Sequence, residues 1–238
     1  MTFQIGMVGS DGILLASDTL CTNIHASNAV ALDGTRTSFD APKIQIEKAK
    51  GIAYCWSGDE LGRILVNQIS DLVNGLRTDM RVFLSMCSQE AIHRAAVIRA
   101  ANPAVPIGSC EVLLAIQTGS TSVSLWKTRI VQSQNQFIPP TIEPIITKAI
   151  TGDAVNAAAF FAEKYFPRFR KLPVQDLIRL AAHVVLMAGK LNSAGVGGLQ
   201  IVVCRGSGFT ELTTEEISSL VEQSSRLDSE IAERIGMI

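Results

Sequence analysis

The amino-acid sequence predicts an α/β protein (α+β type) with antiparallel sheets and helices in consecutive pairs. Paired apolar runs separated by turn residues indicate β-hairpins. Between the hairpins lie stretches with an apolar residue at every third or fourth position, which indicates amphipathic helices, and these stretches come two at a time. The order is compatible with two stacked sheets that helices cover on both outer faces.

The first eighteen residues predict a hairpin around which the rest of the chain is organised. Apolar runs flank Ser10-Asp11-Gly12, which is a turn signal. Antiparallel pairing returns Asp18, at the end of the second strand, to the neighbourhood of Thr2, at the start of the first. Removal of Met1, which generally requires a small second residue, would give Thr2 a free α-amine. A structural Thr2 is the alternative, because β-branched residues are common in strands.

The elements that follow are assigned from periodicity and turn residues. Residues 20–40 read as a loop by composition, and residues 132–144 show no clear periodicity. A single domain at 1–238 is expected, with a C-terminal helical tail at about 213–238. The predicted elements are a hairpin at 43–57, helices at 59–76 and 78–101, a hairpin at 111–126, a strand at 145–151, helices at 152–165 and 173–194, a strand at 199–204 and a polar helix at 213–234.

Composition narrows the function classes. Hydrophobic residues make up 47% of the chain and charged residues 18%, which predicts large subunit interfaces. The formal net charge of −1 gives no electrostatic reason to expect nucleic acid or a membrane surface as partner. Five scattered cysteines without a Cys-x-x-Cys pair, and no visible signal peptide, predict a cytoplasmic protein with reduced thiols. The three histidines lie far apart, so neither a metal site nor a cofactor is expected.

Thr2, Asp18 and Lys43 form a candidate catalytic set. A threonine hydroxyl needs a base to become a nucleophile, and an N-terminal threonine carries one in its own α-amine. A nearby lysine favours the neutral amine because like charges repel, and a carboxylate is then needed to hold that lysine. Asp18 is placed to hold Lys43. The alternative for Lys43 is a solvated lysine at a strand edge.

The residues that carry a family resemblance lie in the first sixty positions. They are Thr2, the turn from Gly6 to Gly12, the strand 13–19, Pro42-Lys43-Ile44 and Trp56-Ser57-Gly58-Asp59. With them the chain resembles the proteasome β-type N-terminal nucleophile hydrolases, the T1 peptidases. It is most similar to their bacterial branch, HslV and the bacterial proteasome homologues, because no pro-peptide precedes Thr2. The resemblance implies a four-layer αββα sandwich of two antiparallel sheets flanked by helix pairs.

The resemblance also implies an activity, a threonine-type endopeptidase in homo-oligomeric stacked rings that acts on polypeptides. A partner unfoldase of the AAA+ class fits such a ring, although no stretch of the sequence indicates one. Gly58, where a strand becomes a helix, would donate its backbone N–H to the oxyanion, and a plain turn glycine is the alternative. The long segment 20–40 would contact substrate or be a neutral insertion.

Three pocket positions and two supporting positions follow from the same resemblance. Cys21 and Thr22 match the strand that pairs with extended substrate. Trp56 would floor the pocket for the residue before the cut and favour small side chains, or it is a core tryptophan. Asp153 stands where the family has a supporting serine, and would either accept a hydrogen bond from the α-ammonium or cap a helix. Ser193 is the best substitute for the family's later aspartate and serine.

Two further functions stay open at the level of sequence. One is a catalytically inactive β-like ring subunit, in which Met1 is retained or the altered positions Asp153 and Ser193 abolish activity. The other is an N-terminal nucleophile amidohydrolase that acts on a small amide. The latter would need polar substrate-specific residues in its pocket in place of an open peptide groove.

Overall fold

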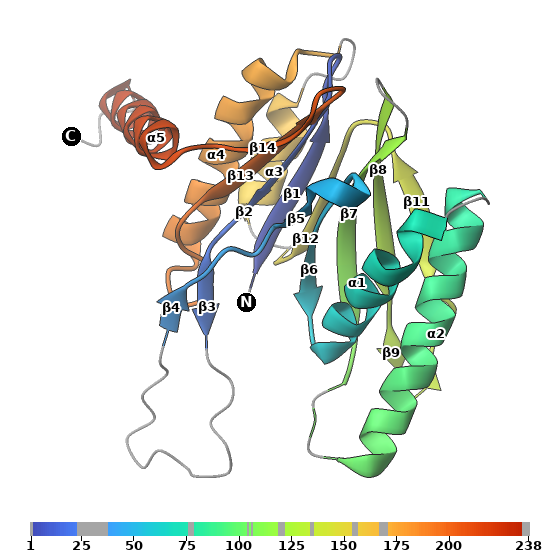
Figure 1. Cartoon of the computed structure of the whole chain (residues 1–238). Coiled ribbons are helices and arrows are strands. Elements are labelled where there is room, and N and C mark those ends of the chain that lie inside the picture. Colours follow the sequence, from blue (N-terminus) through green and yellow to red (C-terminus); the bar gives the residue numbers. More distant parts are fainter. Residues whose placement is uncertain are drawn as a thin grey trace, which may run out of the picture.

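The chain folds into four layers, as a computed structural model shows (Figure 1). One helix pair covers each outer face of two stacked antiparallel sheets, so the predicted αββα sandwich is confirmed. The residues that the structure describes are 2–22, 38–75, 79–103, 105, 107–118, 122–133, 136–153, 157–166 and 171–234.

The hairpin predicted for the first eighteen residues lies inside the first sheet. Its strand order is β12-β1-β2-β13-β14, and all neighbours are antiparallel. The turn at Ser10-Asp11-Gly12 joins β1 and β2 as predicted. The strands of this sheet are β1 (Phe3–Val8), β2 (Ile13–Ser17), β12 (Lys148–Gly152), β13 (Gln200–Arg205) and β14 (Gly208–Glu211).

The second sheet has the order β11-β8-β7-β6-β5, also fully antiparallel. The hairpins predicted at 43–57 and 111–126 are β5–β6 and β7–β8. Two short ribbons lie outside the main sheets. The strands are β5 (Gln45–Glu47), β6 (Ile52–Gly58), β7 (Cys110–Thr118), β8 (Ser122–Ile130) and β11 (Thr141–Ile145), and the ribbons are β3 (Leu20–Thr22) with β4 (Ser38–Asp40) and β9 (Gln132–Ser133) with β10 (Gln136–Phe137).

The helices follow the predicted order. The helices are α1 (Glu60–Leu72), α2 (Met80–Ala101), α3 (Ala157–Tyr165), α4 (Val174–Leu191) and α5 (Thr214–Arg234), with 3₁₀ turns at Lys48–Lys50 and Val73–Gly75. Residue 78, where the second helix was expected to begin, lies outside the described residues, and Asp79 caps α2 by accepting from the Arg81 N–H at 2.8 Å. Thr213 and Glu216 form a reciprocal capping box at the start of α5.

Alternation along the strands separates three apolar cores. Ala53, Cys55 and Leu113 point into the core between the two sheets, whereas Tyr54 and Leu114 point toward α1 and α2. A third core lies between the first sheet and helices α3 and α4. Helix α5 lies beside α4 on the outside of the molecule (Figure 1) and buries Leu220 against this core.

Several strands, and the two ends of the predicted loop 20–40, differ from the sequence-based expectations. The segment 132–144 contains β9, β10 and most of β11, where Pro144 is tolerated because β11 lies at the edge of its sheet. The short edge strand β14 was not expected. The predicted loop 20–40 begins and ends in the β3–β4 ribbon, and its middle lies outside the described residues. The strand predicted at 145–151 is β12, with Ile145 in β11 instead.

Candidate active site

Thr2, Asp18 and Lys43 meet at one end of the sandwich. Lys43 comes from the segment between β4 and β5, and its Nζ lies 3.2 Å from Thr2 Oγ1 and 2.7 Å from Asp18 Oδ2. Thr2 directly precedes β1 and Asp18 directly follows β2, so the antiparallel register places them side by side. A cation therefore bridges a hydroxyl and a carboxylate, which is the arrangement predicted from the sequence.

Asp18 is anchored from several directions. Its side chain has no exposed surface, and Asp18 Oδ1 accepts from the Phe3 N–H at 2.9 Å. Burial raises the pKa of Asp18, while Lys43 and the backbone N–H groups of Phe3 and Gly197 oppose that shift. Lys43 is only 10% exposed, so the ion pair is largely shielded from water. Such a pair fixes position more than it stabilises the fold, because both charges lose hydration.

The carbonyl of Thr2 is held by the β-strand on the other side of β1. The Asp153 N–H donates to Thr2 O at 2.8 Å, and Gly152 precedes it with a φ of +82°. A Cβ at Gly152 would lie 1.9 Å from Thr2 O, so only glycine fits this approach. The side chain of Asp153 accepts from Asn192 Nδ2 at 3.1 Å, at the end of α4. Asp153 thus holds Thr2 through its backbone and turns its carboxylate toward Asn192.

Gly58 ends β6 at the same end of the molecule. It has a φ of +99°, and a Cβ there would lie 2.2 Å from the carbonyl oxygen of Ser109, so this corner also requires glycine. Helix α1 begins two residues later, at Glu60. Gln4, which is fully buried, donates from Nε2 to Trp56 O at 3.1 Å. Since Gln4 follows Thr2 by two positions and Trp56 precedes Gly58 by two, this bond joins the two strands close to both residues.

Glu111 makes a second link between the sheets near Thr2. It lies opposite Ser57 in the β6–β7 register, and its Oε2 accepts from the Gly152 N–H at 3.3 Å. Lys127 lies 3.1 Å from Glu111 Oε1 and also donates to Ile150 O at 3.0 Å. The carboxylate therefore supports the corner that carries the Thr2 carbonyl.

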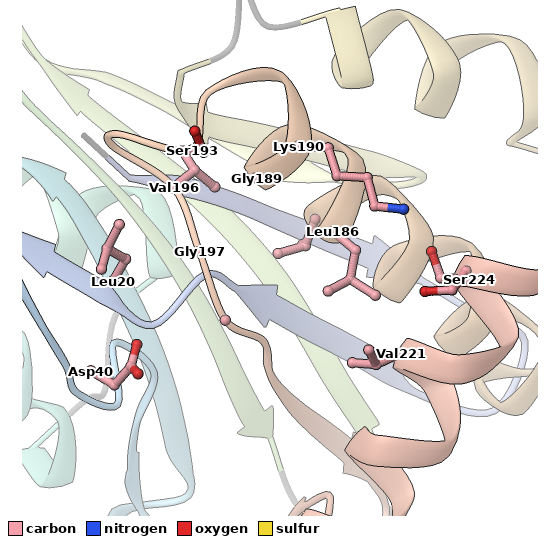
Figure 2. A pocket seen from close by; sticks show the side chains of 13 residues that line it. Leu20, Asp40, Leu186, Gly189, Lys190, Ser193, Val196, Gly197, Val221 and Ser224 are labelled. Atoms are coloured by element: carbon pink, nitrogen blue, oxygen red, sulfur yellow. The ribbon is translucent and has the colours of Figure 1, made fainter. Parts of the chain in front are cut away.

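The remaining predicted residues lie around this centre or apart from it. Trp56 packs its ring against Gly62 of α1, in the core beneath the outer helices. Cys21 is half-buried opposite Phe39 in the β3–β4 ribbon, and Thr22 is paired with Ser38 at its end. Ser193 is exposed in the turn after α4, on the rim of a hollow of about 480 Å³ between α4 and α5 (Figure 2).

Several residues of the site were not anticipated from the sequence. They are Gln4, Glu111, Asn192 and Gln200, the last of which contacts the backbone of Lys43 and Ile44. Uncharged or paired side chains within strands and caps carry no spacing signal that distinguishes them from ordinary structural residues. Glu111 could have been singled out, because it is an acidic residue at the start of an otherwise apolar run.

The described part of the chain contains neither a metal-binding cluster nor a membrane-spanning helix. There, no group of three or more His, Cys, Asp or Glu side chains is arranged to hold a metal ion. In the same residues, no helix has both the length and the apolar character needed to cross a membrane. All five cysteines are free thiols, and four of them are buried.

Two stacked antiparallel sheets between helix pairs define a proteasome-like, Ntn-like fold. Solved structures with this fold include Anbu (ancestral beta-subunit) from Yersinia bercovieri, at 12% identity, a TM-score of 0.66, and coverage of 99% of this chain and 97% of that one. Another is the helical assembly of the Anbu complex from Pseudomonas aeruginosa, at 15% identity, a TM-score of 0.66, and coverage of 98% and 96%.

A third similar structure is a Gly-1 mutant of Anbu from Hyphomicrobium sp. strain MC1, at 11% identity, a TM-score of 0.64, and coverage of 100% and 98%. No family model and no curated protein sequence matches the chain. These likenesses show the fold. They also correct the expected HslV-like branch, which was wrong: the structures found are of Anbu, a distinct branch.

Proposed function

We propose that this chain is a threonine-type endopeptidase of a proteasome-like assembly, with Thr2 as its nucleophile after removal of Met1. The observation that carries the proposal is the position of Lys43 Nζ, 3.2 Å from the Thr2 hydroxyl and 2.7 Å from a buried carboxylate. A lysine at this place favours the neutral form of a nearby amine and stabilises a developing alkoxide. The free α-amine has an ordinary pKa of about 7.7–8.0, so only a modest reduction is needed at neutral pH.

The proposed reaction is an acyl transfer in two stages. Thr2 Oγ1 attacks the peptide carbonyl while the α-amine takes its proton, and the Gly58 N–H donates to the oxyanion that forms. The α-ammonium then returns the proton to the leaving amine, and the C–N bond breaks to leave an ester on Thr2. Water, deprotonated by the same amine, hydrolyses the ester and regenerates the hydroxyl. Asp18 holds Lys43 throughout and exchanges no proton.

Polypeptide substrates would bind as an added strand. The β3 strand, with Cys21 and Thr22, lies next to Asp18 in sequence and belongs to a two-stranded ribbon, so it offers an edge close to the nucleophile. A strand edge beside Thr2 favours extended polypeptide chains over compact small amides as substrates.

We infer that the chain assembles with copies of itself. The outer helices carry large exposed apolar side chains, namely Val82 (50% exposed), Met86 (59%) and Val97 (56%) on α2 and Phe160 (70%) on α3. The Pseudomonas aeruginosa structure is described as a helical assembly, which supports homo-oligomers while leaving closed and open arrangements as alternatives. An isolated monomer at high concentration in size-exclusion chromatography would argue against this inference.

Intact-mass analysis with a peptide epoxyketone tests the nucleophile. This inhibitor reacts with the hydroxyl and the free α-amine of one residue, so it requires a processed threonine. The expected result is an untreated mass without Met1, followed by the addition of one inhibitor per chain, and no adduct on Thr2→Ala. A chain that lacks Met1 and gives no adduct would refute the proposed nucleophile.

A second candidate is an inactive β-like ring subunit, and one observation favours it. Asp153 stands where the family has a supporting serine, its backbone N–H donates to Thr2 O, and its carboxylate accepts from Asn192. A carboxylate near the α-ammonium stabilises its charged form and opposes the effect of Lys43. If Asp153→Ser creates adduct formation that the wild-type chain lacks, this second candidate is correct.

A further inference from the structure

Gln200 makes an unusually complete set of contacts beside the candidate active site. It is 5% exposed and lies opposite Ser17, the residue before Asp18, in the β2–β13 register. Its Oε1 accepts from the backbone N–H groups of Lys43 and Ile44, both at 2.8 Å. Its Nε2 donates to Ile44 O at 3.1 Å. One side chain thus holds the backbone at the residue that carries the ammonium.

Glu211 determines which way the Gln200 amide faces. Glu211 ends β14, the neighbour of β13, and its Oε1 accepts from Gln200 Nε2 at 2.8 Å. An ionised carboxylate can only accept hydrogen bonds, so the amide nitrogen must face Glu211. The amide oxygen then faces the two N–H groups of Lys43 and Ile44. With the amide reversed, its nitrogen would meet those two donors and its oxygen would meet the carboxylate.

The Lys43 segment needs such an external support. It lies between the β3–β4 ribbon and β5, and Pro42 before it has no N–H to hold it in a sheet. The next ladder bonds begin only at β5, where Gln45 pairs with Tyr54. The reach of Lys43 Nζ to Thr2 and Asp18 therefore depends on where its backbone is fixed.

We propose that Gln200, oriented by Glu211, is the positioning residue that sets the reach of the Lys43 ammonium to Thr2 and Asp18. The inference rests on the proposed function, since it assigns Gln200 a part in the same reaction. Gln200 touches neither substrate nor nucleophile and acts through Lys43. It therefore affects the chemical step, while leaving the surface that binds the substrate unchanged.

The variant Gln200→Leu removes the clamp and keeps the side-chain volume. Its effect is measured with a peptide epoxyketone, separating the maximal labelling rate from the inhibitor concentration that gives half of it. The maximal rate should fall by about tenfold to a hundredfold, since a misplacement near 1 Å costs up to about 10² in rate. The half-saturating concentration should change by less than about threefold, because uniform binding is retained.

A charge swap distinguishes positioning from general damage. Gln200→Glu alone places two carboxylates together and should be slower than wild type. Combined with Glu211→Gln, the carboxylate at 200 again accepts from the Lys43 and Ile44 N–H groups and from the amide at 211, and only the bond to Ile44 O stays lost, so labelling should recover in part, by at least about fivefold. A double variant no faster than Gln200→Glu would overturn the proposal.

Gln117 offers a matched control. It is a glutamine in a strand, half-buried where Gln200 is buried, and its Nε2 donates to Gly206 O at 2.7 Å at the end of β7 away from Gly58. Gln117→Leu removes a comparable hydrogen bond and should leave the maximal labelling rate unchanged. If both leucine variants slow labelling equally, the effect of Gln200 is structural and the proposal fails.

Amide hydrogen exchange separates this inference from the proposed function. Gln200→Leu should accelerate exchange at the Lys43 and Ile44 amides, whether or not the protein is a peptidase. If wild-type protein gives no adduct, the proposed function fails, and accelerated exchange still supports the clamp. If wild-type protein labels but Gln200→Leu changes neither labelling nor exchange, the clamp is overturned and the proposed function stands.

Discussion

The close approach of Gly152 to Thr2 allows the placement of the proposed nucleophile to be tested by a single methyl group. A Cβ at position 152 would lie 1.9 Å from Thr2 O and 2.8 Å from its carbonyl carbon. Alanine must therefore push the Thr2 carbonyl back by about 1.1 Å to reach even the shortest tolerated contact, near 3.0 Å. Since the Asp153 N–H donates to that same oxygen, the displacement also weakens the bond that holds Thr2.

The expected size of the effect follows from this shift. A displacement near 1 Å in a catalytic group costs up to about 10² in rate, which corresponds to about 2.7 kcal/mol of barrier. Gly152 also has a φ of +82°, so alanine adds a backbone strain of about 1–3 kcal/mol to the folded state. Gly152→Ala should therefore lose both activity and stability.

Gly208→Ala is the control that separates these two losses. Gly208 has a φ of +118°, but among the described residues no atom beyond its two chain neighbours lies within 4 Å of the position of its Cβ. The control should lose a similar amount of stability and label with a peptide epoxyketone at the wild-type rate. Urea denaturation gives the stability, and intact mass against time gives the labelling rate. A Gly152→Ala protein that labels within about threefold of wild type would refute the reasoning, since the expected factor is near 10².

Three further predictions concern other buried polar groups. In acid, Asp18 takes up a proton and releases Lys43, so labelling should fall as the pH is lowered, and it should do so above the ordinary titration range of an aspartate because burial raises the pKa of Asp18. Over the same pH range, the unfolding free energy of the wild type relative to Asp18→Asn should increase as the pH falls. A loss of unfolding free energy in parallel with the loss of labelling would contradict this. Gln4→Met should slow labelling by about tenfold and cost about 1–3 kcal/mol, because Trp56 O loses its donor near Gly58; lost stability with unchanged labelling would contradict this. His183 contacts Ser224 of α5 at 2.8 Å, and burial lowers the pKa of His183. The free energy of unfolding should therefore fall as the pH drops below 6.5, the pKa of the unfolded state, by at most about 1.4 kcal/mol per pH unit. His183→Gln should abolish this slope in urea titrations, and a persisting slope would contradict the assignment.

The parts of the fold that the sequence predicts share a local cause. Turn residues at Ser10-Asp11-Gly12 and the three-to-four spacing of apolar residues in α1 and α4 are set by contacts close in sequence. The strand β11 was missed because an edge strand buries little and tolerates Pro144, so its pattern is weak. The strand β14 has only four residues, and its stability comes from pairing with β13 rather than from its own pattern.

The candidate site was predictable only where chemistry dictates residue type. The hydroxyl of Thr2, the ammonium of Lys43 and the carboxylate of Asp18 suggest a chemical role from the sequence alone. The supporting amides Gln4 and Gln200 do not, because their value depends on which backbone groups the fold brings beside them. The supporting role of Ser193 stays a prediction, and the neighbouring Asn192, which sequence reasoning did not single out, contacts Asp153.

The position of the first hairpin inside its sheet has a consequence for biosynthesis. The strands β1 and β2 are made first, yet their neighbours β12 and β13 lie at residues 148–152 and 200–205. Pairings this distant in sequence form late, because the intervening chain must be ordered before they can form. On the ribosome, we expect β1 to lack its outer neighbour until residues 148–152 have been made, and β2 to lack its own until residues 200–205 have been made. A nascent chain that ends before these strands would carry Thr2 without Gly152 and Gln200, and under the proposed function it would lack hydrolytic activity until the domain is complete.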